Sequence, residues 1–139
     1  MPKKQQRPNI APASLPVSPA ATTTTQIDYL SFSLRYLDGG VWKKTNKEDR
    51  AAALDRIRML STTPFADIRL APRHGLGFEH IDAASLHIPV PPGLTCGTAS
   101  RPASFRFGRG KKAMVGVRVD SVFYVLCFEH SFGDAYAHR

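Results

Sequence analysis

Residues suited to acting on a polyanion gather in the last third of the chain. Five basic side chains lie on or between its predicted strands: Arg106, Arg109, Lys111, Lys112 and Arg118. The last predicted strand is followed by Glu129, His130, Tyr136 and His138. A packed sheet does not need these charges. A surface that binds RNA needs several, because each phosphate that it neutralises releases condensed counterions. We therefore predict that this region binds RNA or another polyanion.

The residues after the last strand have side chains that RNA cleavage requires. When a ribose 2′-hydroxyl attacks its own phosphate, a base takes its proton, an acid protonates the leaving oxygen, and cations stabilise the phosphorane. His130 and Tyr136, with Glu129 beside them, are the candidates for proton transfer. The arginines are candidates for the third role, because guanidinium matches phosphate bidentately. The pattern predicts a metal-independent endoribonuclease.

A non-catalytic nucleic-acid-binding module is the alternative. In that interpretation His130 ends a strand and Tyr136 packs a terminal segment, and the basic residues bind RNA without cleaving it. The histidines do not predict a metal site, because no two of them have an i,i+4 or HExxH relation; they are His74, His80, His87, His130 and His138. We expect neither a metal nor a cofactor.

The composition narrows the class of partner. The chain has a formal net charge of +8, from 19 Lys and Arg against 11 Asp and Glu. Three basic residues lie in the acid-free first 25 residues, so the remainder keeps +5. Such a balance favours nucleic acid or an acidic partner, although it also serves solubility alone. No segment approaches the roughly 20 apolar residues of a membrane span. Two cysteines and no secretory signal are typical of the reducing cytoplasm.

Hydrophobic patterning predicts a single α+β domain over residues 26–139, behind a disordered tail. The tail, residues 1–25, is rich in proline and lacks aromatic residues, so it cannot bury enough apolar surface to fold. Alternating apolar residues predict a half-buried strand over residues 26–37. Asp38-Gly39-Gly40 predicts a turn after it.

Two helices are expected to follow this strand as a hairpin. The capping-box pattern Thr45–Glu48 begins a helix that runs to about Leu60. Its apolar stripe is Leu54, Ile57 and Leu60. A second short helix begins at Pro64, with Thr63 as its N-cap, and ends near Leu70.

Three antiparallel strands are predicted to form a meander over residues 104–128. They lie around residues 105–107, over residues 113–119 and over residues 122–128, with Asp120-Ser121 as a two-residue hairpin turn. The last strand is apolar without alternation, which is typical of burial on both faces, and Cys127 within it is expected to be a buried thiol. Residues 71–103 hold five prolines and predict a long loop-rich segment, with a short strand around Leu86–Val90.

The order of strand, helical hairpin and basic meander resembles the RelE/ParE-type toxins of bacterial toxin–antitoxin systems, over residues 27–138. In that family a strand with an Arg-x-Gly/Arg pattern precedes an apolar strand and a terminal His…Tyr pair. Residues 105–109 (with Arg106 and Arg109), Val122–Phe128 and His130…Tyr136 occupy those places here. The resemblance implies a RelE-like fold and a toxin that acts on RNA. Its expected partner is an acidic antitoxin, whose carboxylates would cover the basic sheet.

The chain also resembles small uncharacterised bacterial proteins, which share stretches seen here at Ser31–Leu37, Arg73–Glu79 and Val122–His130. That resemblance implies no activity. A third alternative is a protein-binding inhibitor of growth or replication. Residues 26–32 resemble, with one extra residue, the Gln-x-x-Leu-x-Phe peptides that dock in the bacterial DNA sliding clamp. The same residues belong to the first predicted strand.

Overall fold

The computed structural model describes residues 28–72, 75–95, 101–109, 111–131 and 133–136. The tail predicted for residues 1–25 lies outside these residues. The helices are α1 (Gly39–Lys44), α2 (Lys47–Ser61) and α3 (Phe65–Leu70), with the 3-10 helices η2 (Ala83–Ser85) and η3 (Pro92–Leu94). The strands are β1 (Ser31–Ser33), β2 (Phe78–His80), β3 (Ala103–Phe107), β4 (Lys112–Val119) and β5 (Val122–Phe128).

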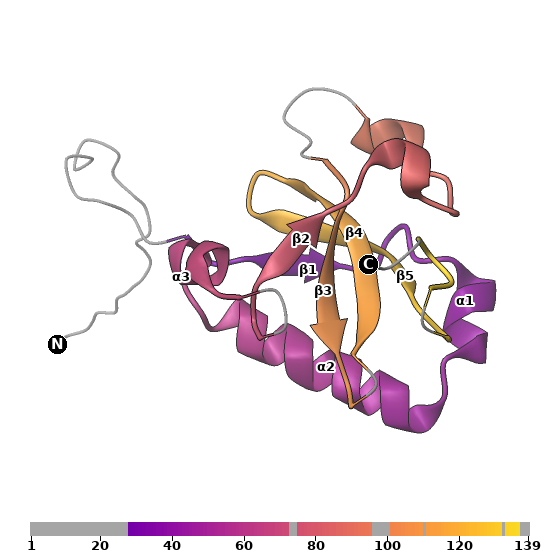
Figure 1. Ribbon diagram of the computed structural model, residues 1–139, viewed down its shortest axis with the longest axis horizontal. Helices are drawn as coiled ribbons and strands as arrows, with labels where there is room; N and C mark the ends of the chain where they lie inside the picture. The colour runs from indigo at the N-terminus through magenta and orange to yellow at the C-terminus, as the bar shows by residue number, and fades with distance from the viewer. Residues whose placement is uncertain (1–27, 73–74, 96–100, 110, 132, 137–139) are drawn as a thin grey trace, which may run out of the picture.

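All five strands form one mixed sheet in the order β1-β5-β4-β3-β2. The strands β3, β4 and β5 are antiparallel neighbours, and Asp120 adopts a φ of 54° in the two-residue connection between β4 and β5. At one edge β1 pairs with β5 in parallel, and at the other β2 pairs with β3 antiparallel. Figure 1 shows α2 running along one side of this sheet and α3 beside β1 and β2. The predicted α+β class is confirmed.

The first strand is much shorter than the predicted 26–37. Only Ser31–Ser33 pair with β5, and Leu37 donates its backbone N–H to the Leu34 carbonyl in a turn. The expected turn at residues 38–40 is instead the start of a helix. The Asp38 side chain accepts the Val41 N–H at 3.0 Å and caps α1. A side-chain cap of this kind satisfies a backbone donor that a short helix otherwise leaves unpaired.

The long helix α2 lies where the sequence places it, with a different cap and a narrower apolar face. Its N-cap is Asn46, whose side chain accepts the Asp49 N–H at 2.8 Å. The Thr45 hydroxyl instead donates to the Val41 carbonyl of α1. Leu60 is fully buried, but Leu54 is 67% exposed, so the predicted stripe was wrong at that position.

The short helix α3 also lacks its predicted cap. Its N-cap is Pro64, which makes no side-chain hydrogen bond. The Thr63 hydroxyl donates to the Met59 carbonyl of α2 at 2.7 Å. Thr63 therefore closes the preceding helix rather than opening the next one.

The register of the strands gives the sheet two faces with different covers. On the first, here called the helix face, the rings of Phe105, Phe107, Phe123 and Phe128 pack with Leu60 and Ala53 of α2. The second, here called the loop face, carries Val115, Val117 and Cys127. Burial raises the pKa of the Cys127 thiol to about 12, and the expectation of a buried thiol is confirmed.

The segment predicted to be mostly loop, residues 71–103, supplies both an edge strand and a cover. The strand is β2, and the predicted strand around Leu86–Val90 was wrong, because Leu86 makes only an isolated bridge with Tyr136. Ile81, Ile88 and Leu94 pack on the loop face. The segment lacks an apolar period because its few apolar residues reach the sheet one at a time, between turns.

Candidate anion-binding pocket

The arginine expected to bind phosphate on β3 is buried. Arg106 is 5% exposed, and its Nη2 lies 2.9 Å from Oε1 of Glu79. Its Nη1 donates to the Lys111 carbonyl at 3.0 Å. These contacts join β2 to the turn between β3 and β4. Arg106 therefore stabilises the hairpin on the loop face and does not present its charge to a ligand.

The other expected cations lie at opposite ends of β4. Lys112 begins that strand and pairs with Asp49 of α2, with 2.8 Å between Nζ and Oδ2. Arg109 and Lys111 are exposed in the turn before it. Arg118 lies six residues further along the strand, which corresponds to roughly 20 Å. The structure therefore does not bring the five expected RNA-binding residues together in one patch.

The expected proton-transfer residue Glu129 is enclosed by backbone. Its side chain is fully buried. Oε1 accepts the Ala113 N–H at 2.8 Å, and Oε2 accepts the N–H groups of Gly133 at 3.1 Å and Ala135 at 3.3 Å. A buried carboxylate with several N–H donors anchors the backbone, and here it ties the C-terminal segment to β4.

Tyr136 is also buried, whereas His130 is exposed. The Tyr136 hydroxyl lies 2.8 Å from Ser104 Oγ and donates to Glu79 Oε1 at 3.0 Å. Burial is the main cause that raises its pKa to about 12. His130 is exposed just after β5. None of Glu129, His130 and Tyr136 lines either of the two pockets described below, and His138 lies outside the described residues.

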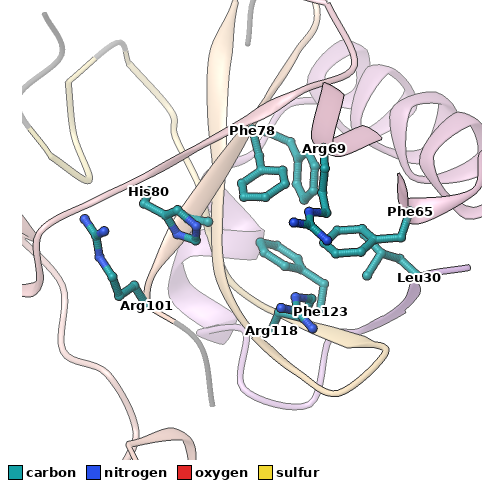
Figure 2. Close-up of a pocket in the computed structure, with 10 residues that line it drawn as sticks. Leu30, Phe65, Arg69, Phe78, His80, Arg101, Arg118 and Phe123 are labelled. Carbon is teal, nitrogen blue, oxygen red and sulfur yellow. The ribbon is translucent and has the colours of Figure 1, made fainter. Parts of the chain in front are cut away.

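A pocket of about 260 Å³ opens on the helix face, beyond the part that α2 covers. Figure 2 shows Leu30, Phe65, Phe78 and Phe123 around it, with His80 and Arg101 on one side. Arg69 and Arg118 complete the ring of labelled residues, and Ala103 and Phe105 also line the cavity. Arg118 is the one residue of this set that the sequence singled out for RNA binding.

Small residues on the central strands leave room for this pocket. His80, Ala103 and Gly116 stand opposite one another on β2, β3 and β4, so they share one row of the helix face. Neither Ala103 nor Gly116 fills the space above its strand. A Cβ on Gly116 would meet the Phe123 ring at 2.6 Å, so the ring lies over the glycine. The glycine thus sets the position of one aromatic wall.

Three arginines from three different elements make the pocket positive. Arg69 belongs to α3, Arg101 precedes β3, and Arg118 lies on β4. The described residues that line the pocket include no carboxylate. Arg101 has a carboxylate neighbour outside the lining, Asp82, but the pair is 3.8 Å apart and largely exposed, so it contributes little.

Arg118 is held in place by its surroundings. Its Nη1 donates to the Asp120 carbonyl at 2.7 Å. Its guanidinium carbon lies 4.9 Å from the centroid of the Phe65 ring, a distance typical of a cation–π contact. The carbonyl and the ring leave the remaining N–H groups of the fork to an anion. A guanidinium held in this way is chemically suited to a bidentate contact with phosphate or carboxylate.

His80 is the titratable residue of the pocket. Its ring lies edge-on to Phe78, with 5.2 Å between centroids. His80 is exposed overall, and its partial burial lowers its pKa below the ordinary 6.5; Arg101 and, more weakly, Arg118 lower it further against a backbone hydrogen bond to Pro102. The imidazole is therefore neutral at pH 7 and has one nitrogen able to accept a proton or a hydrogen bond.

A second pocket, of about 320 Å³, adjoins the first and shares Leu30, Phe65 and Arg118 with it. Its remaining lining residues are Asp28, Tyr29, Asp120 and Ser121. This pocket is more acidic than the first. Arg118 lies at the boundary between them.

Most of the residues that line the pocket were not predicted from the sequence. Arg69, Arg101 and His80 lie on segments predicted as a helix end or as loop, and nothing in their spacing joins them. The signal available was the alternation in Leu76, Phe78 and His80, which is typical of a strand. Pairing that strand with β3 would have placed His80 beside Ala103.

The segment that resembles a clamp-binding peptide belongs to the core. Leu30 is 3% exposed, and the Phe32 ring packs against Phe105 and Phe123. Ser31 donates its N–H to the Ser121 carbonyl at 2.8 Å. Docking of these side chains elsewhere would require β1 to leave the sheet. Gln26 and Ile27 lie outside the described residues.

Two further features are absent from the described part of the chain. No group of three or more His, Cys, Asp or Glu side chains is placed there to hold a metal ion. None of the helices in the same residues has the length and apolar character needed to cross a bilayer. Comparisons of the chain with protein-family models, with curated proteins and with solved structures found no match in any of the three.

Proposed function

We propose that the protein binds single-stranded RNA, with one nucleotide seated in the pocket of Arg118. The observation that carries this proposal is the convergence of Arg69, Arg101 and Arg118 on an aromatic pocket whose described lining has no carboxylate. Guanidinium groups bind phosphate, and aromatic rings stack on bases that are not paired. A ligand that combines an anion with a flat apolar group matches both parts of the pocket.

The size of the pocket favours one nucleotide of a longer strand. At about 260 Å³ it is slightly smaller than a pocket for a drug-sized ligand, which measures roughly 300–1,000 Å³. The phosphates on either side would then follow the exposed cations at the rim, Arg69 and Arg101. This assignment keeps RNA as the polyanion and moves the site from the Arg106 hairpin to the opposite end of the sheet.

The toxin-like role stays part of the proposal. The order of a first strand, helices and basic antiparallel strands is the layout on which the resemblance to RelE/ParE-type toxins rests. An acidic antitoxin would compete with RNA for Arg69, Arg101 and Arg118, because its carboxylates match the same guanidinium groups. Such a partner would neutralise the pocket without entering the core.

The test is RNA affinity in matched arginine variants. Fluorescence anisotropy with a labelled 12-nucleotide single-stranded RNA should give a dissociation constant at least tenfold higher for Arg118→Ala. A hydrogen bond to a charged group contributes about 1.5–3 kcal/mol, and about 1.4 kcal/mol is tenfold in affinity. Arg69→Ala should weaken binding in the same direction.

The matched control is Arg58→Ala, which removes the same charge from an exposed position of α2 outside the pocket. Its dissociation constant should stay within about twofold of the unchanged protein, since a distant exposed charge is largely screened. Thermal unfolding of all variants establishes that they are folded. Equal affinities for Arg118→Ala and Arg58→Ala would refute the site.

A further inference from the structure

We infer that the pocket cleaves RNA and that His80 takes the proton from the attacking ribose 2′-hydroxyl. This inference rests on the RNA binding proposed above and adds a reaction to it. It assigns the catalytic base to a residue on β2, at the opposite face of the sheet from Tyr136 and Glu129. It requires no metal ion, because the arginines supply the positive charge.

The geometry carries the assignment. The register places the His80 side chain on the helix face, above Ala103, and thereby in the pocket. Arg118 enters from β4, Arg69 from α3 and Arg101 from the segment before β3. One neutral imidazole and three guanidinium groups thus surround a single cavity. That set provides a base and the cations for a phosphorane, the two roles that RNA transesterification needs first.

Partial burial and nearby positive charge keep His80 unprotonated before RNA binds. The charged groups that line the pocket with it are Arg69, Arg101 and Arg118, and Asp82 pairs with Arg101 outside the lining. Burial and the positive charge of Arg101 lower the pKa of His80 below 6.5. A bound phosphate has the opposite effect, because a negative neighbour favours the protonated form. Binding of RNA therefore moves the pKa toward neutrality, where a general base and acid is most effective.

The reaction balances without another reactant. The 2′-oxygen of one nucleotide forms a bond to the adjacent phosphorus, and its proton passes to the free ring nitrogen of His80. The bond from phosphorus to the 5′-oxygen of the next nucleotide breaks. That oxygen takes a proton from water, and the imidazolium returns its proton to solvent. The products are a 2′,3′-cyclic phosphate and a 5′-hydroxyl group.

The residues predicted earlier for proton transfer do not fit this step. The Tyr136 hydroxyl is already hydrogen-bonded to Ser104 and Glu79, and burial raises its pKa to about 12. Glu129 is fully buried, with backbone N–H groups on both oxygens. His130 is exposed and is not part of the pocket lining. Among the described histidines, His80 lines the pocket that Arg69, Arg101 and Arg118 also line.

The experiment is single-turnover cleavage of an end-labelled single-stranded RNA by saturating full-length protein. Saturation removes differences in affinity from the measured rate constant. His80→Gln should lower the rate constant at least 100-fold, within the roughly 10²–10⁴-fold contribution of a general base. The matched control is His130→Ala, which should cleave at the rate of the unchanged protein. A substrate with 2′-deoxyribose at the cleaved position should bind and stay intact.

The pH profile separates a base from a structural role. The rate constant of the unchanged protein should fall as the pH falls through the pKa of bound His80, because the protonated ring cannot accept a proton. In His80→Gln this acidic limb should disappear. RNA that binds with the arginine dependence predicted above but stays uncleaved would overturn the inference and leave the proposed function standing. Cleavage that survives His80→Gln but fails in His130→Ala would also overturn it.

Discussion

Two arginines on neighbouring strands of this protein have opposite roles. Arg106 on β3 faces the loop side, where Glu79 and the Lys111 carbonyl satisfy it and 6% of its side chain is exposed. Arg118 on β4 faces the helix side, where the Phe65 ring and the Asp120 carbonyl orient it toward a cavity. A buried ion pair of the first kind fixes a structure. A partly exposed guanidinium with N–H groups to spare is suited to the anion binding proposed for the pocket.

The sequence indicated which residue types suit the proposed chemistry but not the surroundings of each side chain. Arg118 was expected to contact phosphate and lines the pocket. The side chains of Glu129 and Tyr136 are of types that can transfer protons, but both are buried in contacts with residues distant in sequence. Burial of this kind depends on tertiary packing, which a single sequence does not reveal. His80 was missed for the same reason, because its arginine neighbours come from three separate segments.

Tyr136→Phe is a direct test of the structural role given to this residue. The variant keeps the ring and loses the hydroxyl that contacts Ser104 and Glu79. The free energy of unfolding should fall by about 1–2 kcal/mol, the net contribution of such hydrogen bonds. Urea denaturation measures this change. RNA affinity and cleavage should be unchanged. A loss of cleavage in a variant of unchanged stability would instead support proton transfer by Tyr136.

Among the helices and strands, the long elements α2, β4 and β5 were predictable, as were the short elements α3 and β3, whereas α1 and β2 were not. The helix α2 and the strands β4 and β5 have 7 to 15 residues, so their apolar period or their continuous apolar run is visible. The elements α1 and β2 have 6 and 3 residues. Each depends on a distant partner, since Trp42 of α1 packs on Phe128 and Phe78 pairs with Phe105. A segment of three to six residues is too short to show a clear hydrophobic period.

Gly116 of β4 determines where one aromatic wall of the pocket lies. A Cβ at position 116 would meet the Phe123 ring at 2.6 Å and overlap the Tyr124 carbonyl oxygen. Gly116→Ala should therefore lower the free energy of unfolding by about 1–3 kcal/mol, the usual cost of overpacking a core. It should also weaken RNA binding, because the displaced ring is a wall of the pocket. Urea denaturation and anisotropy measure the two effects.

Gly39→Ala is the matched control for that substitution. It adds the same methyl group at the start of α1, where nothing lies within 4 Å of the new Cβ. Alanine is favoured over glycine in a helix by about 0.8–1 kcal/mol, so the stability should be equal or slightly higher. RNA affinity should not change. Equal stability of the two variants would show that Gly116 does not hold Phe123 in place.

For the molecule as a whole, the arrangement of charge matters more than its total. The formal charge of +8 includes cations that form ion pairs within the protein, such as Arg106 and Lys112. Others lie in the turn before β4, at Arg109 and Lys111. The convergence of three arginines around aromatic rings is confined to the far end of the sheet. Composition alone predicted a polyanion partner, and the fold determines which cations are available to contact one.

The salt dependence of RNA affinity is the most direct test of RNA binding at this pocket. If Arg69, Arg101 and Arg118 each neutralise one phosphate, the logarithm of the association constant should decrease linearly as the logarithm of the salt concentration increases. The slope should be about −2, from roughly 0.7 for each phosphate of a single strand. Arg118→Ala should make the slope shallower by about 0.7, whereas Arg58→Ala should leave it unchanged. A slope near zero, or the same slope in Arg118→Ala as in the unchanged protein, would contradict RNA binding at this pocket.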